Sequence, residues 1–255
     1  MDHDRHCTEI VTQTELLTAA LQNGDLRASV PSCPGWTLGM LLRHIGGGHR
    51  WLEELVRTRS TEFLPDDGFR ALEGDDTGDA PTAWLHEGAT RLAETLREAG
   101  PDTKIWTPLE LRGTTAFFAR RFAHETLLHR ADATLATGTA FSVDQETALD
   151  AVDEWMELDA LPQHFEHAPR KRELLGPGRT LAFGATDADA AWIVDLTGDV
   201  IVWRRSHEPA AVVVRAPLTD LLLGIYRRTP LPRDGVEIRG DRDLLDLWLA
   251  HAAFG

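Results

Sequence analysis

VPSCPGWTLGMLLRHIGGGH, residues 30–49, joins a Pro- and Gly-rich turn to an apolar helix that carries two histidines. Thr37 stands where a helix N-cap is expected, and apolar residues follow it at helical spacing to about Arg57. The glycines 46–48 each cost about 1 kcal/mol relative to alanine in a helix interior. The helix tolerates that cost more easily where another backbone or a ligand must approach it closely.

Three more segments of the first half have helical periodicity. They cover about Arg5–Gln22, Thr82–Ala99 and Thr114–Thr137. Four amphipathic helices in succession predict a helical bundle. A further helix is predicted from Asp144 to about Phe165, which would still belong to the helical domain.

Beyond residue 166 the pattern changes. HAPRKRELLGPGR reads as a linker, and four short runs rich in Val, Ile and Trp then predict strands: RTLAFGAT, AAWIVDL, DVIVWRR and AAVVVRA. Gly198–Asp199 predicts a hairpin turn, and Pro217–Tyr226 and Asp243–Ala253 predict two short helices. The expected fold class is therefore α+β, with a helical domain over residues 1–168 and a small α+β domain over residues 178–255.

Composition narrows the classes of function. The 255 residues carry a net charge of -15, which disfavours binding to nucleic acid. The sequence contains no apolar run of the ~20 residues that a membrane span needs, and its polar N-terminus does not resemble a signal peptide. We therefore expect a cytoplasmic protein. Its two cysteines, Cys7 and Cys33, are expected to be free thiols.

The most chemically suggestive segment is RRFAHETLLHRADA, residues 120–133. The zinc-protease pattern H-E-x-x-H fails here because His124 and His129 are five residues apart, or about 140° around a helix. Glu125 and His129 are four apart and differ by only about 40°, so they form half of a metal site. A facing helix would supply the third ligand, from His44 or His49, and periodicity does not choose between them. The same Glu–His spacing is also common in surface pairs, and a lone histidine on an apolar helix is usually a core residue.

These two segments resemble the signatures of a known family. Residues 30–44 fit the pattern V-P-x-C-P-G-W-x-x-x-x-L-x-x-H, and residues 121–132 fit R-x-x-x-E-x-x-x-H-R-x-D. Both patterns are typical of the mycothiol-dependent maleylpyruvate isomerase family. The resemblance implies a DinB-like four-helix bundle followed by a sterol-carrier-like α+β domain. It implies His44, Glu125 and His129 as metal ligands, with zinc as the metal and mycothiol as the thiol cofactor. Asp132 is then a candidate to orient a ligand imidazole.

The resemblance also points to an arginine in the second half of the chain. Family members often carry a W-G-R segment there, and Arg228 falls on its arginine, although Tyr226-Arg227 replaces Trp-Gly. The family arginine handles an anionic substrate, so Arg228 is predicted to be catalytic, with Arg227 as an alternative. A surface salt bridge is the competing interpretation.

The predicted function is a divalent-metal-dependent enzyme that activates the mycothiol thiol for addition to an electrophilic small molecule. It would be a maleylpyruvate isomerase-like cis-trans isomerase or a mycothiol S-transferase. Two alternatives stay open: a non-catalytic protein that binds metal and a small ligand, and a DinB-type metal-dependent hydrolase. The sequence does not identify the substrate or the oligomeric state.

Overall fold

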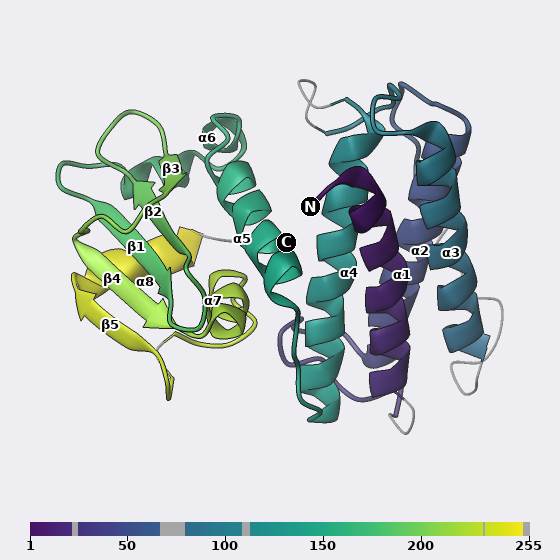
Figure 1. The fold of residues 1–255 in the computed structure, drawn as a ribbon, viewed down its shortest axis with the longest axis horizontal. Helices are drawn as coiled ribbons and strands as arrows, with labels where there is room; N and C mark the ends of the chain where they lie inside the picture. The colour runs from purple at the N-terminus through teal and green to yellow at the C-terminus, as the bar shows by residue number, and fades with distance from the viewer. Residues whose placement is uncertain (22–24, 67–79, 109–112, 232, 252–255) are drawn as a thin grey trace. The chain divides into compact units, whose positions relative to one another are not determined.

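The chain divides into two compact units, Met1–Phe141 and Ser142–Gly255. The computed structural model describes residues 1–21, 25–66, 80–108, 113–231 and 233–251. A helical first unit and a second unit built on a mixed sheet confirm the predicted α+β class (Figure 1). Among the described helices, none is long and apolar enough to cross a membrane.

Four helices that run alongside one another form the first unit (Figure 1): α1 (His3–Ala20), α2 (Leu38–Arg57), α3 (Ala80–Ala99) and α4 (Thr115–Thr137). The predicted bundle is confirmed, with helix ends shifted by up to two residues at the described ends. Thr37 is the N-cap of α2, since its hydroxyl accepts a hydrogen bond from the Met40 backbone N–H at 3.2 Å. The α4 helix ends at Gly138, whose φ of 70° is the left-handed conformation that favours glycine.

The glycines of α2 let neighbouring helices approach it closely. A Cβ atom built on Gly46 would lie 1.9 Å from the Trp84 ring of α3, and one on Gly48 would lie 3.3 Å from the Phe122 ring of α4. The close approach predicted at these glycines is therefore made by aromatic side chains of the protein itself. This packing brings α2 and α4 near enough for their polar side chains to meet.

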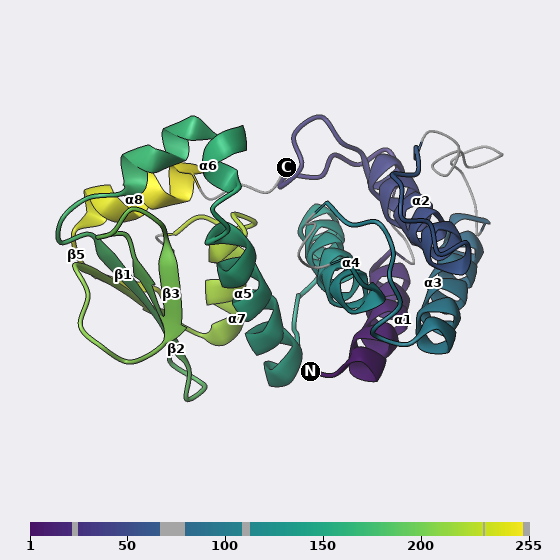
Figure 2. The same cartoon turned by 90° about the horizontal axis from the view of Figure 1, so that it is seen from above.

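The second unit contains a five-stranded sheet in the order β3-β2-β1-β4-β5. The strands β1 and β4 are parallel and the other neighbouring pairs are antiparallel. Figure 2 shows α5, α7 and α8 around this sheet, and Trp248 of α8 contacts both Trp155 and Phe183 through ring centroids about 5 Å apart. The elements are α5 (Gln145–Asp159), α6 (His164–His167), η2 (Pro169–Leu174), β1 (Thr180–Ala185), β2 (Ala191–Asp195), β3 (Val202–Arg205), β4 (Val212–Ala216), α7 (Leu218–Ile225), β5 (Glu237–Gly240) and α8 (Arg242–His251).

The structure differs from the sequence prediction between residues 142 and 178. The α5 helix ends at Asp159 instead of about Phe165, because Pro162 disfavours helical backbone at the preceding residue. The segment predicted to be a linker forms the 3₁₀ helix η2, in which Lys171 is buried and donates to Asp159. The division into compact units falls between residues 141 and 142, and the predicted domains cover residues 1–168 and 178–255.

A fifth strand, β5, was absent from the sequence prediction. Its sequence, EIRG, is short and has one apolar residue, so period-2 alternation is not visible. Its place beside β4 depends on Gly240, where a Cβ atom would lie 2.1 Å from the Ala211 carbonyl oxygen. The helix after β5, α8, is described as far as His251, and the last two residues of the predicted helix lie outside the described residues.

Candidate metal centre and adjoining cavity

The turn before α2 sets the position of its first histidine. Gly35, with a φ of 84°, allows the chain to reverse between two hydrogen bonds, from Trp36 N–H to the Cys33 carbonyl and from Val30 N–H to the Trp36 carbonyl. The Thr37 cap then starts the helix, and His44 follows two turns later on the side that faces α4. The apolar residues around His44 hold this helix in the bundle core.

His44 meets two side chains of α4, Glu125 and His129. The His44 Nε2 atom lies 3.2 Å from Glu125 Oε1, and the His129 Nε2 atom lies 3.0 Å from the same oxygen. One potential ligand atom from each of the three residues lies within 4.8 Å of the other two. The structure therefore brings together the three predicted ligands, and we call this group the His44–Glu125–His129 triad.

Asp132 holds His129 from the side opposite the triad. Its Oδ2 atom accepts a hydrogen bond from His129 Nδ1 at 2.8 Å and lies 3.6 Å from the Cys33 thiol, while Oδ1 accepts from the Ser32 hydroxyl at 2.5 Å. Asp132 is fully buried. When a metal is bound, a carboxylate bonded to Nδ1 would keep the proton there and direct the Nε2 lone pair at the metal.

Trp36 lies against both imidazoles of the triad. Its ring centroid is 5.0 Å from that of His44, in an edge-on arrangement, and 6.3 Å from that of His129, with the two planes 20° apart. Its indole covers one side of the triad, and Ser32 and Cys33 of the same turn contact Asp132 of α4.

The charges of the triad are strongly coupled. Although burial raises the pKa of the Glu125 carboxyl, the imidazoles of His129 and His44 hold it well below its usual value. Burial lowers the pKa of His129, but the carboxylates of Glu125 and Asp132 outweigh that effect and raise it well above its usual value. Without a cation, the pair is thus an ionised carboxylate and an imidazolium. A divalent cation bound to the triad would replace the proton on His129 Nε2 as the positive charge beside Glu125.

The arrangement fits a divalent cation. Two nitrogen or oxygen ligands about 2.0–2.1 Å from a tetrahedral zinc ion lie about 3.4 Å from each other, so the observed 3.0 and 3.2 Å require only small movements. Two imidazoles and a carboxylate are a ligand set used by catalytic zinc sites with one open position. The neighbouring set of Cys33, His129 and Asp132 is less suited to a metal. Both Asp132 oxygens in that set already accept hydrogen bonds from the protein.

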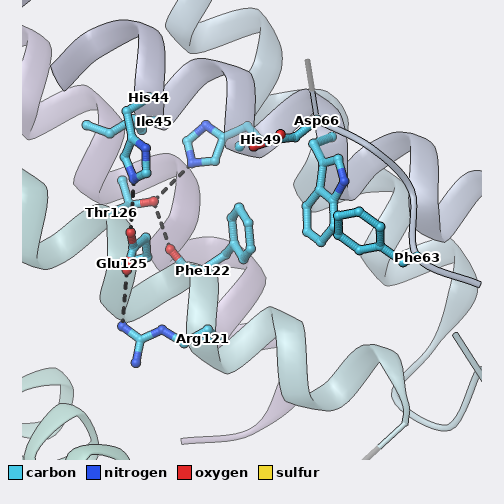
Figure 3. Close-up of a pocket in the computed structure, with 11 residues that line it drawn as sticks. His44, Ile45, His49, Phe63, Asp66, Arg121, Phe122, Glu125 and Thr126 are labelled. Atoms are coloured by element: carbon cyan, nitrogen blue, oxygen red, sulfur yellow. Dashed lines mark hydrogen bonds and ion pairs between the residues drawn. The ribbon is translucent and has the colours of Figure 1, made fainter. Parts of the chain in front are cut away.

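A cavity of about 290 Å³ adjoins the triad (Figure 3). His44 and Glu125 form part of its wall, and the rest comes from α2, α4 and the segment after α2, including His49, Trp51, Phe63 and Phe122. Figure 3 shows His44 and His49 reaching from one helix towards Glu125 and Thr126 of the other. A molecule in this cavity would therefore have access to the triad.

The other candidate residues have partners outside the triad. His49 Nε2 bonds to the Thr126 hydroxyl at 3.0 Å, and His124 contacts the His6 ring of α1, with ring centroids 6.0 Å apart. Arg228 belongs to the second unit, where its Nη1 donates to the Tyr226 carbonyl at 3.1 Å, and its catalytic role stays a prediction. Arg121, which lies 3.5 Å from Glu125, was not among the predicted site residues. Its position four residues before Glu125 was the available signal.

Two models of known protein families match most of the chain. Residues 7–134 match the model of the mycothiol maleylpyruvate isomerase N-terminal domain, and residues 146–247 match that of the corresponding C-terminal domain. A search of curated proteins found no significant match. The boundary between the two family models agrees with the division into compact units at residues 141 and 142.

Two solved structures resemble the whole chain. A mycothiol-dependent maleylpyruvate isomerase matches with a TM-score of 0.64 at 15% sequence identity, over 93% of each chain. A mutant of a mycothiol-dependent maleylpyruvate isomerase, with one histidine changed to alanine, matches with a TM-score of 0.60 at the same identity and coverage. At this level of identity, the likeness shows a shared fold.

Proposed function

Because the chain belongs to the mycothiol-dependent maleylpyruvate isomerase family, we propose that it is a divalent-metal-dependent enzyme acting through the thiol of mycothiol. The thiol would add to an electrophilic small molecule, as in a cis-trans isomerase or an S-transferase. One observation carries the proposal: the Nε2 atoms of His44 and His129 lie 3.2 and 3.0 Å from the same oxygen of Glu125, beside an accessible cavity.

The proposed metal is zinc, with His44, Glu125 and His129 as its protein ligands. A zinc ion held there would bind the cofactor thiol and lower its pKa, which is about 8.5 in a free thiol, so that it reacts as the thiolate. The chain's own residues prepare this site. Asp132 fixes the His129 tautomer, and Trp36 limits the movement of both imidazoles.

The two proposed reactions share their first step, in which a carbon–sulfur bond forms at an activated double bond or another electrophilic carbon. In an isomerase, rotation about the new single bond follows. The carbon–sulfur bond then breaks to return the trans alkene and the thiol, so no atom is gained or lost. In a transferase, the carbon–sulfur bond stays, and a leaving group departs or a proton is taken up. Both reactions use the same thiol site.

The proposed role of Arg228 is to bind a substrate carboxylate, for which a guanidinium offers two parallel hydrogen-bond donors. This role follows from the family resemblance of the segment around Arg228. Arg228→Lys should raise KM for an anionic substrate and leave KM for an uncharged electrophile unchanged. Arg233→Lys, in the same unit, is the control.

The proposal is tested by measuring metal content together with thiol-dependent activity. The full-length chain is loaded with zinc and assayed with maleylpyruvate and with a bimane electrophile, each with and without mycothiol. We expect about one zinc per chain and turnover only with mycothiol. Appearance of the trans isomer would identify an isomerase, and a stable S-conjugate would identify a transferase.

Variants make this test specific to the triad. His44→Ala and Glu125→Ala should lose both zinc and activity. His49→Ala removes a histidine from the same helix and should keep zinc, because His49 bonds to Thr126 instead of the triad. Stoichiometric zinc without activity towards either electrophile would overturn the proposed chemistry. Equal zinc loss in all three variants would overturn the assignment of His44.

A further inference from the structure

The cavity beside the triad has a predominantly apolar wall. Its aromatic side chains come from separate elements: Trp51 from α2, Phe122 from α4, and Phe63 from the segment that follows α2. Ile45 and Gly48 line it between them. At about 290 Å³ it is near the lower end of the ~300–1,000 Å³ range of small-molecule sites, a size suited to a compact ring system.

One hydrogen bond and several ring contacts within the protein hold this wall in place. The Trp51 indole N–H donates to the Leu64 carbonyl at 2.7 Å, which fixes the segment that carries Phe63 against α2. Trp106 reinforces that segment, since its ring centroid lies 5.1 Å from that of Phe63. The rings of Trp51 and Phe122 are 19° from parallel, with centroids 6.4 Å apart. The aromatic wall is thus formed before any ligand binds.

Two polar groups of the wall are already bonded to each other. The Thr126 hydroxyl donates to the Phe122 carbonyl at 2.8 Å, and its oxygen lies 3.0 Å from His49 Nε2. The hydroxyl therefore accepts from His49, which is held as the neutral tautomer with its proton on Nε2. Burial lowers the pKa of His49 to about 3, so this side chain carries no charge at neutral pH.

The charged side chains of the wall do not favour an anion. Arg121 is the cationic side chain among the described lining residues, and its guanidinium lies 3.5 Å from Glu125 Oε2. Asp66 adds a second carboxylate to the lining. An anionic ligand would have to compete with Glu125 for Arg121 and would also face Asp66.

We propose that this cavity receives an uncharged aromatic group of the electrophilic substrate. The electrophilic character of the substrate rests on the function proposed above. The preference for an uncharged aromatic group rests on the aromatic lining of the cavity and on its charges. Aromatic rings gain from edge-on and offset contacts with one another beyond the area that they bury. Compounds with a ring system next to the reactive carbon are therefore the substrate class that fits, and an anionic group would have to lie outside this cavity.

The test uses unreactive probes, so that it is independent of turnover. Binding of 2-naphthalenemethanol and of 2-naphthalenesulfonate to the full-length chain is measured by calorimetry, both with zinc and after chelation. We expect the uncharged probe to bind at least about tenfold more tightly in both states. Equal binding of the two probes, tighter binding of the sulfonate, or binding of neither would overturn the proposal.

Two variants locate the binding site. Phe63→Ala removes an exposed ring and should weaken binding of the uncharged probe about two- to tenfold without disturbing the core. Gly48→Leu adds a side chain against Phe122 and should reduce affinity by at least about tenfold, as expected for a filled cavity. Leu16→Ala removes an exposed apolar side chain of α1 and should leave affinity unchanged. Probe binding that neither cavity variant changes would place it elsewhere.

Mycothiol itself is the alternative occupant. Its addition to the chelated protein should leave probe affinity within about twofold, and full competition would assign the cavity to the thiol cofactor and overturn the proposal. Failure of the proposed function has a different signature. In that case the uncharged probe would bind as expected while the zinc-loaded chain shows no mycothiol-dependent turnover.

Discussion

Asp132→Asn should weaken zinc binding although residue 132 is not a proposed ligand. Asp132 is fully buried, and its carboxylate accepts from His129 Nδ1 and from Ser32. Asparagine keeps the size of the side chain but offers a neutral oxygen. A hydrogen bond to a charged partner contributes about 1.5–3 kcal/mol, against about 0.5–1.5 kcal/mol for a neutral one. The expected loss is therefore about 1–2 kcal/mol, or about five- to thirtyfold in zinc affinity.

Competition with a chromophoric chelator measures this affinity, and Glu9→Gln is the matched control. Glu9 is also a buried carboxylate of the first unit, but it bonds to Gln13 at 2.6 Å and Arg5 at 2.8 Å. Its substitution should lower stability and leave zinc affinity unchanged. Zinc affinity of Asp132→Asn within about twofold of the wild type would refute the role given to Asp132, since such partners usually contribute ten- to a hundredfold. An equal loss in Glu9→Gln would attribute the effect to general destabilisation.

Two further predictions concern buried groups away from the triad. Burial raises the pKa of the Cys7 thiol to about 11. At pH 8 iodoacetamide should therefore alkylate native Cys7 about a hundredfold more slowly than a free thiol. Labelling of Cys7 at the rate of a free thiol, followed by mass spectrometry, would contradict this. Lys171→Met leaves the Asp159 carboxylate buried without its partner and should lower the free energy of unfolding by about 3–5 kcal/mol. Burial raises the pKa of Asp159, so protonation relieves the unpaired charge as pH falls, and the loss should be smaller at pH 5 than at pH 8. Urea titrations at pH 5 and pH 8 measure the free energy of unfolding. The exposed Arg170→Met is the control and should change it little. A loss in Lys171→Met that does not depend on pH would contradict the explanation.

Much of the fold could be predicted because local patterns determine it. The apolar period of α2 and the Thr37 cap located that helix to within a residue, and four such helices predicted the bundle. The strand β5 was missed because its four residues carry no periodic signal and its position depends on a close approach to Ala211. The Pro and basic residues of the segment 169–174 are typical of a linker, which is why the sequence predicts one there. Lys171 is nevertheless buried by its pairing with Asp159, a contact that sequence composition does not reveal.

The candidate site was predictable only in part for the same reason. Helical spacing put Glu125 and His129 on one side of α4 and separated His124 from them. Choosing His44 over His49 required the family resemblance, because the choice depends on how α2 is rotated against α4. The structure shows that rotation: His44 reaches Glu125 at 3.2 Å, and His49 reaches Thr126 one residue further along. The cavity wall was not predicted, since its aromatic rings come from segments far apart in the sequence.

X-ray absorption at the zinc edge of the zinc-loaded chain, before and after addition of mycothiol, tests the central claim most directly. The account predicts two imidazole ligands and a carboxylate oxygen at about 2.0–2.2 Å, and then a new sulfur neighbour at about 2.3 Å once the thiol is added. A spectrum with fewer than two imidazoles would contradict the proposed triad. A spectrum that mycothiol leaves unchanged would contradict the proposed activation of the thiol at this centre.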